Sequence, residues 1–104
     1  MGYTWSMIEI RETKVFAKWI DGLRDVRARA RILVRIERLA GGNPGDVKPV
    51  GGGVSELRID CGPGYRVYYV QRGQEVIILL AGGDKRTQSR NIQTAIRLAQ
   101  DLSE

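Results

Sequence analysis

The chain has 104 residues, a length that suits one domain with a modest core and leaves no room for a second. Its 17 lysines and arginines outnumber its 12 acidic residues, which gives a net charge of +5 and an isoelectric point near 9.8. This excess of positive charge favours an anionic partner, nucleic acid above all, although a basic composition also serves solubility alone.

Histidine is absent from the sequence, and cysteine occurs once, at Cys61. A single cysteine excludes an internal disulfide and a multi-cysteine zinc site, and without histidine the thiol cannot be activated as in a Cys-His enzyme. The acidic residues are scattered without the spacing of metal ligands. We therefore expect neither a metal nor another cofactor.

Hydropathy along the chain favours a cytoplasmic protein. The longest apolar run, Val76 to Ala81, is far shorter than the ~20 residues of a transmembrane helix. The first residues also lack the pattern of a signal peptide. We interpret residues 1–6 as an N-terminal extension, either artificial or the product of an upstream start, that precedes a single domain over residues 7–104.

The first half of that domain is predicted to form one strand and two helices. Met7 to Arg11 alternates like a short strand, and Thr13 is placed to cap a helix that ends near Gly22. Apolar residues at helical spacing predict a second helix from about Asp25 to Ala40, which the glycines that follow terminate.

Arginines on the second predicted helix form a cationic ridge. At about 100° per residue, five of them fall within a band of about 80°: Arg24, Arg27, Arg31, Arg35 and Arg38. Like charges at this spacing repel one another, so the ridge favours an anionic partner, either RNA or an acidic protein segment. The alternative is a solvated face whose arginines pair with acidic residues elsewhere.

A glycine-rich segment from Gly41 to Gly53 is predicted to be a long loop. It lacks the Gly-Lys-Ser/Thr ending of a nucleotide-binding P-loop, so ATP or GTP binding is not expected. Lys48 either presses on RNA from this loop or is simply solvated.

Three hairpin-linked strands and a helix complete the domain. The strands carry Arg58 and Arg66 and end just before Lys85 and Arg86; their sequences are ELRID, YRVYYVQ and EVIILLAG. The last helix is predicted over Ser89 to Leu102. This order of elements predicts an α+β domain with its helices packed on one face of a mainly antiparallel sheet.

The segments MIEIRET, VFAKWIDGL, ELRI, GPGYRVYY and GGDKRTQ resemble the RelE/ParE superfamily of bacterial toxins, most closely its HigB-like, phage-derived branch. The resemblance covers most of the chain. It implies a RelE-like fold and an endonuclease that cuts messenger RNA in the ribosomal A site. It also implies a cognate antitoxin, expected to be a HigA-like helix-turn-helix protein.

The resemblance assigns roles to individual residues. Arg66 matches the arginine of the family's Gly-Tyr-Arg strand and is expected to clamp the scissile phosphate, for which its planar, permanently charged fork is suited. Arg86 resembles a second phosphate-binding arginine, and we expect the two guanidinium groups to converge on one open hollow. In each case the alternative is an arginine that merely covers apolar surface.

Arg58 aligns with one of two basic residues that RelE-type enzymes carry on the preceding strand, whereas the other position holds Glu56. This carboxylate either accepts the proton of the 2′-hydroxyl or only pairs with Arg58 or Arg66. The remaining candidates are expected to contact RNA: Lys85, Lys48, Arg90, Asn91, Arg27, Arg31, Arg35 and Arg38. Asn91 has the alternative of capping the last helix.

Together these features predict a ribosome-dependent mRNA endoribonuclease that acts by metal-independent attack of the 2′-hydroxyl. A shared scaffold does not fix function. The alternatives are therefore a ParE-like protein that poisons DNA gyrase without catalysis, and a degenerate member that only binds antitoxin or RNA.

Overall fold

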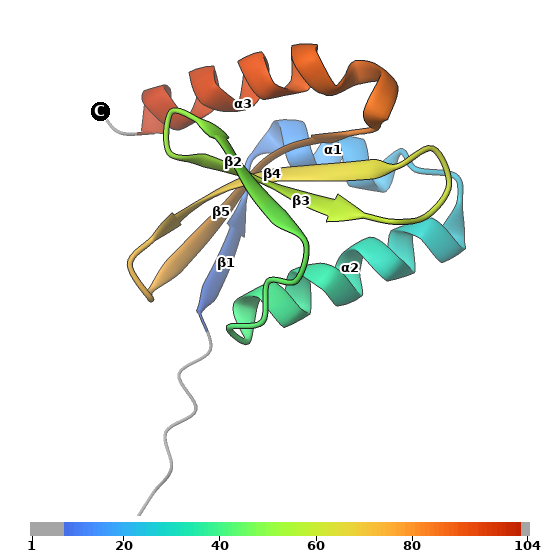
Figure 1. Cartoon of the computed structure of the whole chain (residues 1–104), viewed down its shortest axis with the longest axis horizontal. Coiled ribbons are helices and arrows are strands. Elements are labelled where there is room, and N and C mark those ends of the chain that lie inside the picture. The colour runs from blue at the N-terminus through green and yellow to red at the C-terminus, as the bar shows by residue number, and fades with distance from the viewer. Residues whose placement is uncertain (1–7, 103–104) are drawn as a thin grey trace, which may run out of the picture.

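The computed structural model describes residues 8–102, so Met7 and the expected extension over residues 1–6 lie outside the described part of the chain. Five strands and three α-helices follow one another, with a short 3-10 turn before the last helix (Figure 1). Their bounds are β1 Glu9–Glu12, α1 Lys14–Asp21, α2 Val26–Ala40, β2 Val47–Gly51, β3 Val54–Ile59, β4 Tyr65–Arg72, β5 Val76–Gly83, η1 Lys85–Thr87 and α3 Gln88–Leu102.

The strands form one sheet in the order β1-β5-β4-β3-β2. All neighbours are antiparallel except β1, which pairs in parallel with β5. The predicted α+β class with a mainly antiparallel sheet is therefore confirmed.

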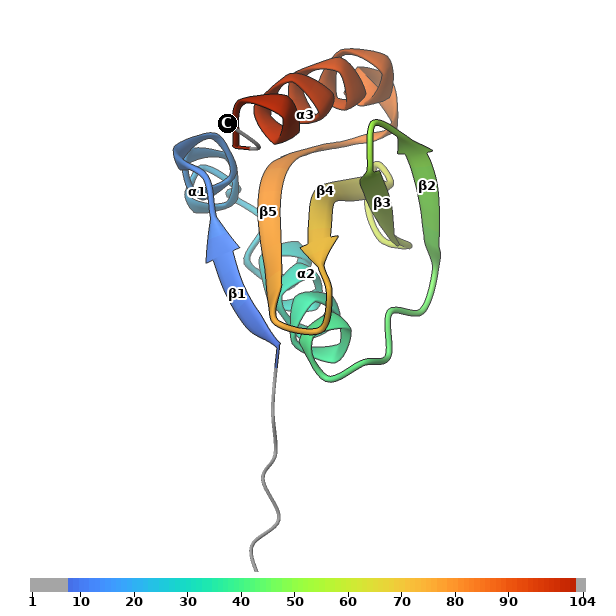
Figure 2. The same ribbon diagram turned by 90° about the vertical axis from the view of Figure 1, so that its left-hand side faces the viewer.

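Helices cover both faces of this sheet. On one face, Phe16 of α1 and Ile32 of α2 join a buried cluster that includes Leu57 of β3. On the other face, Ala95 and Ala99 of α3 pack against the sheet. Figure 1 shows α3 and α2 on opposite sides of the strands, and Figure 2 shows α1 beyond the end of β1 and next to β5. The prediction that all helices share one face is thus wrong for α3, because an apolar stripe predicts that a helix packs but not on which face of a sheet.

The starts of the first two helices follow from their capping residues. The Thr13 side chain accepts a hydrogen bond from the Phe16 amide, and the Asp25 side chain accepts from the amides of Arg27 and Ala28. Each cap satisfies amides that a helix start leaves without partners. Both predicted helices are confirmed.

The segment predicted as one long loop contains an edge strand. β2 pairs antiparallel with β3, with Lys48 opposite Glu56 and Pro49 opposite Ser55. Pro and Gly weaken strand propensity, so the sequence VKPVG reads as a loop, but an edge strand tolerates proline because one side of its backbone has no partner. No helix in the described residues is long and apolar enough to cross a membrane.

Candidate functional site

Two arginines lie directly opposite each other across the hairpin of β3 and β4. Arg58 pairs in register with Arg66, and Arg66 in turn pairs with Gly83 of β5. Cross-strand partners project on the same face of a sheet, so both side chains stand on the face that α3 packs against. Two like charges in this relation are destabilising unless a third group compensates them.

That group is Glu56, which is fully buried. Its Oε1 accepts a hydrogen bond from Arg58 Nε at 3.0 Å and lies 3.9 Å from Arg66 Nε. Its Oε2 accepts from the Tyr68 hydroxyl at 3.0 Å and from Gln88 Nε2 at 2.8 Å. One oxygen therefore faces the two arginines, and the other is held by the core and by the first residue of α3.

Electrostatics keep this buried carboxylate ionised. Burial raises the pKa of Glu56, but hydrogen bonds from Gln88, Arg58 and Tyr68 and the charge of Arg66 outweigh it, so the pKa lies below its ordinary value. Burial, together with the hydrogen bond to Glu56, raises the pKa of the Tyr68 hydroxyl and keeps it a donor.

The pairing expected for Glu56 is confirmed for both Arg58 and Arg66. A role as general base does not fit this geometry, because the side chain has no exposed surface and its acceptor positions are occupied. Glu56 instead pairs with two guanidinium groups on the same face of the sheet.

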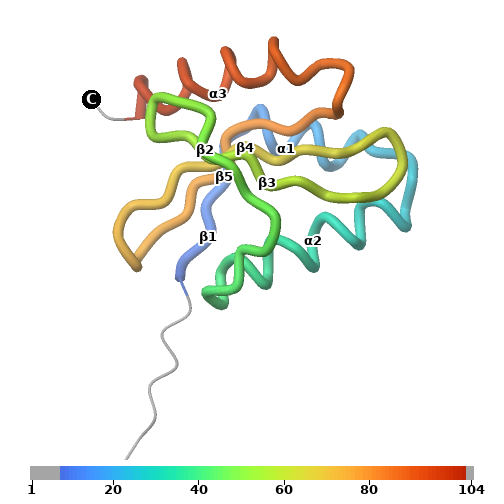
Figure 3. The backbone as a smooth tube through the Cα atoms, in the orientation of Figure 1, coloured from blue at the N-terminus to red at the C-terminus, as the bar shows by residue number. Residues whose placement is uncertain are grey.

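The arginines open onto a hollow of about 490 Å³ at the end of the sheet. Its cationic lining comes from Arg58, Arg66 and Lys85; its other lining residues are Asp46, Ile59, Asp60, Gly62, Pro63 and Gly64. Figure 3 shows the β3–β4 turn and the β5–α3 connection at the same end of the molecule. The side chains of Arg58 and Arg66 are 32% and 13% exposed, so each has a buried part and a part that reaches the surface.

Arg66 is tethered mainly through one end of its guanidinium group. Its Nη1 donates to the carbonyl oxygens of Gly64 and Tyr65 at 3.2 and 3.3 Å. Its Nε is buried and has no hydrogen-bond partner among the described residues. The turn that follows β3 therefore fixes the direction in which Arg66 points.

Arg86 does not join Arg66 at the hollow. Asp84 caps the 3-10 turn by accepting from the Arg86 amide at 2.8 Å, and the Arg86 side chain, 83% exposed, lies 3.5 Å from the Asp84 carboxylate. The turn leaves Lys85 on the wall of the hollow in the place expected for Arg86. The convergence expected of Arg66 and Arg86 is therefore not found at this hollow, where Lys85 lies with Arg66 instead.

The start of α3 approaches the sheet at Gly83. A Cβ atom there would lie 2.0 Å from Asn91 Oδ1 and 2.8 Å from Thr87 Oγ1, so no larger residue fits. Asn91 lies inside α3, which begins at Gln88, so it is not the cap of this helix; its Oδ1 accepts a hydrogen bond from the Thr87 hydroxyl. This close approach places Gln88 within reach of Glu56. No pattern in the sequence marks Gln88 and Tyr68 as partners of Glu56, because only the burial of Glu56 gives them this role.

Two further RNA-binding candidates lie outside the lining of the hollow. Lys48 is exposed on β2 opposite Glu56, so it stands on the same face as the arginines and next to them in the sheet. Arg90 is exposed on α3. Neither has a contact that decides its role.

The arginine ridge on α2 is interrupted. Arg24 precedes the helix, and Arg35 turns inward, where it donates to the backbone carbonyls of Arg58, Pro44 and Asp46. Arg35 therefore ties the loop after α2 to β3, and its partly exposed guanidinium group is engaged by these backbone carbonyls. Arg27, Arg31 and Arg38 remain exposed.

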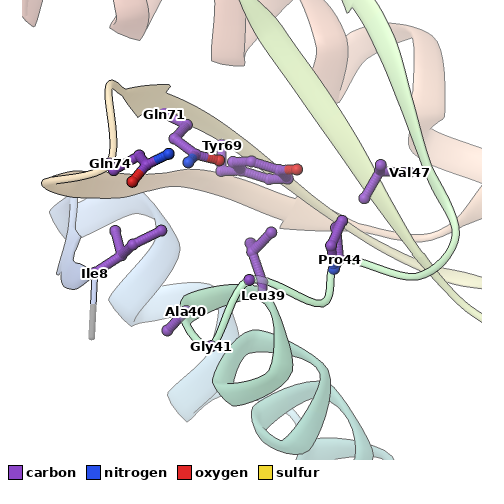
Figure 4. Close-up of a pocket in the computed structure, with 10 residues that line it drawn as sticks. Ile8, Leu39, Ala40, Gly41, Pro44, Val47, Tyr69, Gln71 and Gln74 are labelled. Atoms are coloured by element: carbon purple, nitrogen blue, oxygen red, sulfur yellow. The ribbon is translucent and has the colours of Figure 1, made fainter. Parts of the chain in front are cut away.

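A second hollow, of about 470 Å³, lies between the C-terminal end of α2 and the sheet (Figure 4). Ile8, Leu39, Tyr69 and Gln71 are among the residues around it. None of its lining residues is charged, in contrast to the hollow at Arg66. A phosphate group therefore has no counter-charge there.

Fold and site together define a small α+β protein of RelE-like architecture with a cation-lined hollow on its sheet. A family model described as "Phage derived protein Gp49-like (DUF891)" matches residues 18–104, and the chain belongs to this family. The family is one of toxins from toxin–antitoxin modules, related to the RelE and HigB type, and it implies a cognate antitoxin as partner. An uncharacterized protein of Haemophilus influenzae is 50% identical over 95 residues, which cover 91% of this chain and 96% of that protein.

Proposed function

We propose that this protein is a ribosome-dependent mRNA endoribonuclease, the toxin of a type II toxin–antitoxin module. The observation that carries the proposal is the single hollow lined by Arg58, Arg66 and Lys85, whose two arginines are held in register above a buried carboxylate. Such a fixed set of cations matches the charge that develops on a phosphate during cleavage.

The chemistry is metal-independent attack by the 2′-hydroxyl. The 2′-oxygen forms a bond to phosphorus as the bond to the 5′-oxygen breaks, which leaves a 2′,3′-cyclic phosphate and a 5′-hydroxyl end. The 2′-hydroxyl loses a proton and the leaving 5′-oxygen gains one. Arg66 and Arg58 stabilise the negative charge on the non-bridging oxygens, and Lys85 adds a third positive charge. Glu56 acts indirectly, because its carboxylate fixes the orientation of the two guanidinium groups.

The test is transcript mapping by primer extension after induced expression, with and without a translation inhibitor. The full-length protein should produce cuts that depend on translation, and Arg66→Ala should reduce them by about 10²–10³-fold. Arg72→Ala is the matched control, because Arg72 is an exposed arginine at the opposite end of the same strand. It should cleave like the unchanged protein.

Thermal unfolding of both variants separates loss of function from loss of fold. Intact transcripts together with gyrase-linked DNA breaks would overturn the proposal in favour of a gyrase poison. Cleavage that survives in a folded Arg66→Ala protein would overturn the assignment of the site.

A further inference from the structure

The outward face of α2 divides lengthwise into an apolar half and a cationic half. Val26, Leu33 and Val34 are 66%, 46% and 45% exposed, and Ala30 between them is also exposed. At about 100° per residue these four residues span about 100° of the helix surface. Arg27, Arg31 and Arg38 follow directly beside them.

This combination is uncommon in the rest of the described chain. Of the five large hydrophobic residues that are exposed there, three lie on α2, and the other two, Val15 and Leu102, lie on different helices. Scattered exposed hydrophobic residues need no explanation, but a contiguous strip beside charges is typical of a protein-binding surface. A surface for RNA alone needs the arginines and gains nothing from exposed leucine and valine.

A hollow of about 390 Å³ lies along the line where the two halves meet. Ala30 and Val34 contribute apolar surface, and Arg31 and Arg38 contribute positive charge; Arg35, Ile59 and Asp60 complete the lining. Two acidic groups belong to this surface and must be avoided by an acidic partner: Asp60 in the lining of the hollow, and the exposed Glu37, which falls within the arc of the apolar residues on α2. The arginines nevertheless outnumber these acidic groups, so the surface has a net positive charge.

We propose that this surface binds an acidic amphipathic helix of the cognate antitoxin. α2 has 15 residues, so a partner helix of about four turns covers its length of about 22 Å. Apolar side chains of the partner pack on Val26, Leu33 and Val34, and one enters the hollow beside Ala30. Its carboxylates pair with Arg27, Arg31 and Arg38.

A helix bound here also reaches the edge of the cation-lined hollow. Ile59 and Asp60 line both that hollow and the one on α2, so the end of β3 forms the wall between them. The antitoxin therefore contacts the turn that directs Arg66, and it can block the approach of RNA without filling the site. This inference rests on the toxin role proposed above, but not on RNA cleavage itself.

The test is calorimetric titration of the purified full-length protein with its purified cognate antitoxin. Val34→Ser and Arg31→Glu should each weaken binding by about tenfold or more. The matched controls are Val15→Ser, since Val15 is 43% exposed on α1, and Arg97→Glu, an exposed arginine on α3. Both should bind within about twofold of the unchanged protein.

Hydrogen exchange gives a second measurement that needs no substitution. Peptides covering Val26–Ala40 should exchange more slowly in the complex. Equal affinities for the α2 variants and the controls would overturn the inference, as would unchanged exchange in α2. A different result would assign the surface to RNA instead. In that case an RNA oligonucleotide would bind tightly, only Arg31→Glu would weaken this binding, and the antitoxin affinity would not change. Transcript mapping is independent of all these outcomes.

Discussion

Replacing Glu56 with glutamine tests the idea that one buried carboxylate organises the site. The carboxylate accepts on both oxygens: Arg58 and Arg66 face Oε1, and Tyr68 and Gln88 donate to Oε2. A carboxamide has only one acceptor oxygen, so its NH₂ group must face donors on one of the two sides. It also leaves the largely buried Arg66 without a counter-charge.

We expect Glu56→Gln to lower the free energy of unfolding by about 3 kcal/mol, the lower end for breaking a buried ion pair. For a domain of this size that corresponds to a fall in Tm of roughly 15 °C, which circular dichroism measures directly.

The matched control is Glu9→Gln. Glu9 pairs with Arg11 two residues away on one strand, as Glu56 pairs with Arg58, but the two side chains are 55% and 61% exposed. Solvent screens an exposed pair strongly, so the control should lose little stability. If the two variants lose the same small amount of stability, the carboxylate does not organise the site.

The pH dependence of stability gives an independent check on Glu56. Because its pKa in the folded protein lies below its ordinary value, the unfolded chain binds more protons in the window between the two values. Its contribution is therefore complete above the ordinary value of about 4.3 and is lost as the pH falls through the folded value. Urea unfolding between pH 7 and 3 should show the difference between the unchanged protein and Glu56→Gln shrinking in acid. A difference that stays constant would contradict the lowered pKa.

Two further substitutions test how the site is supported. Arg35→Met removes hydrogen bonds to three backbone carbonyls and should reduce stability by about 1–3 kcal/mol in urea unfolding. Arg38→Met, at an exposed position of the same helix, should change stability little. Equal losses in the two variants would contradict the tethering role of Arg35. Gly83→Ala places a methyl group against Asn91 and should reduce stability by about 1–3 kcal/mol. Gly41→Ala should be tolerated, because a Cβ atom at Gly41 has no neighbour closer than 3.5 Å. A stable Gly83→Ala protein would show that the start of α3 can move away from the sheet.

Much of the fold follows from local signals in the sequence. The cap at Thr13 and the apolar spacing of both segments predict the two early helices, because capping and burial act within a few residues. β2 was not predicted, since its strand character comes from pairing with β3 and not from its own residues. The face on which α3 packs is likewise set by tertiary contacts.

Local signals in the sequence also predict part of the site. Arg58 and Arg66 can be named from their strands, and their pairing across the sheet follows from the register of the hairpin. The predicted position of Arg86 is wrong because Asp84 begins a capped turn. The spacing of Asp84 and Thr87 resembles a capping motif, which is the signal in the sequence for this turn. The two residues that donate to Glu56 Oε2 are 12 and 32 positions away, and no local pattern connects them with Glu56.

The edge strand β2 has a consequence for how a partner can attach. Proteins that bind by adding a strand need a free row of backbone donors and acceptors along a sheet edge. Pro49 has no amide hydrogen to offer, and the register of β2 shifts between Pro49 and Gly51, so this edge is irregular as a template. An antitoxin that extended the sheet at β2 would lack a continuous ladder there, which disfavours strand addition at this edge.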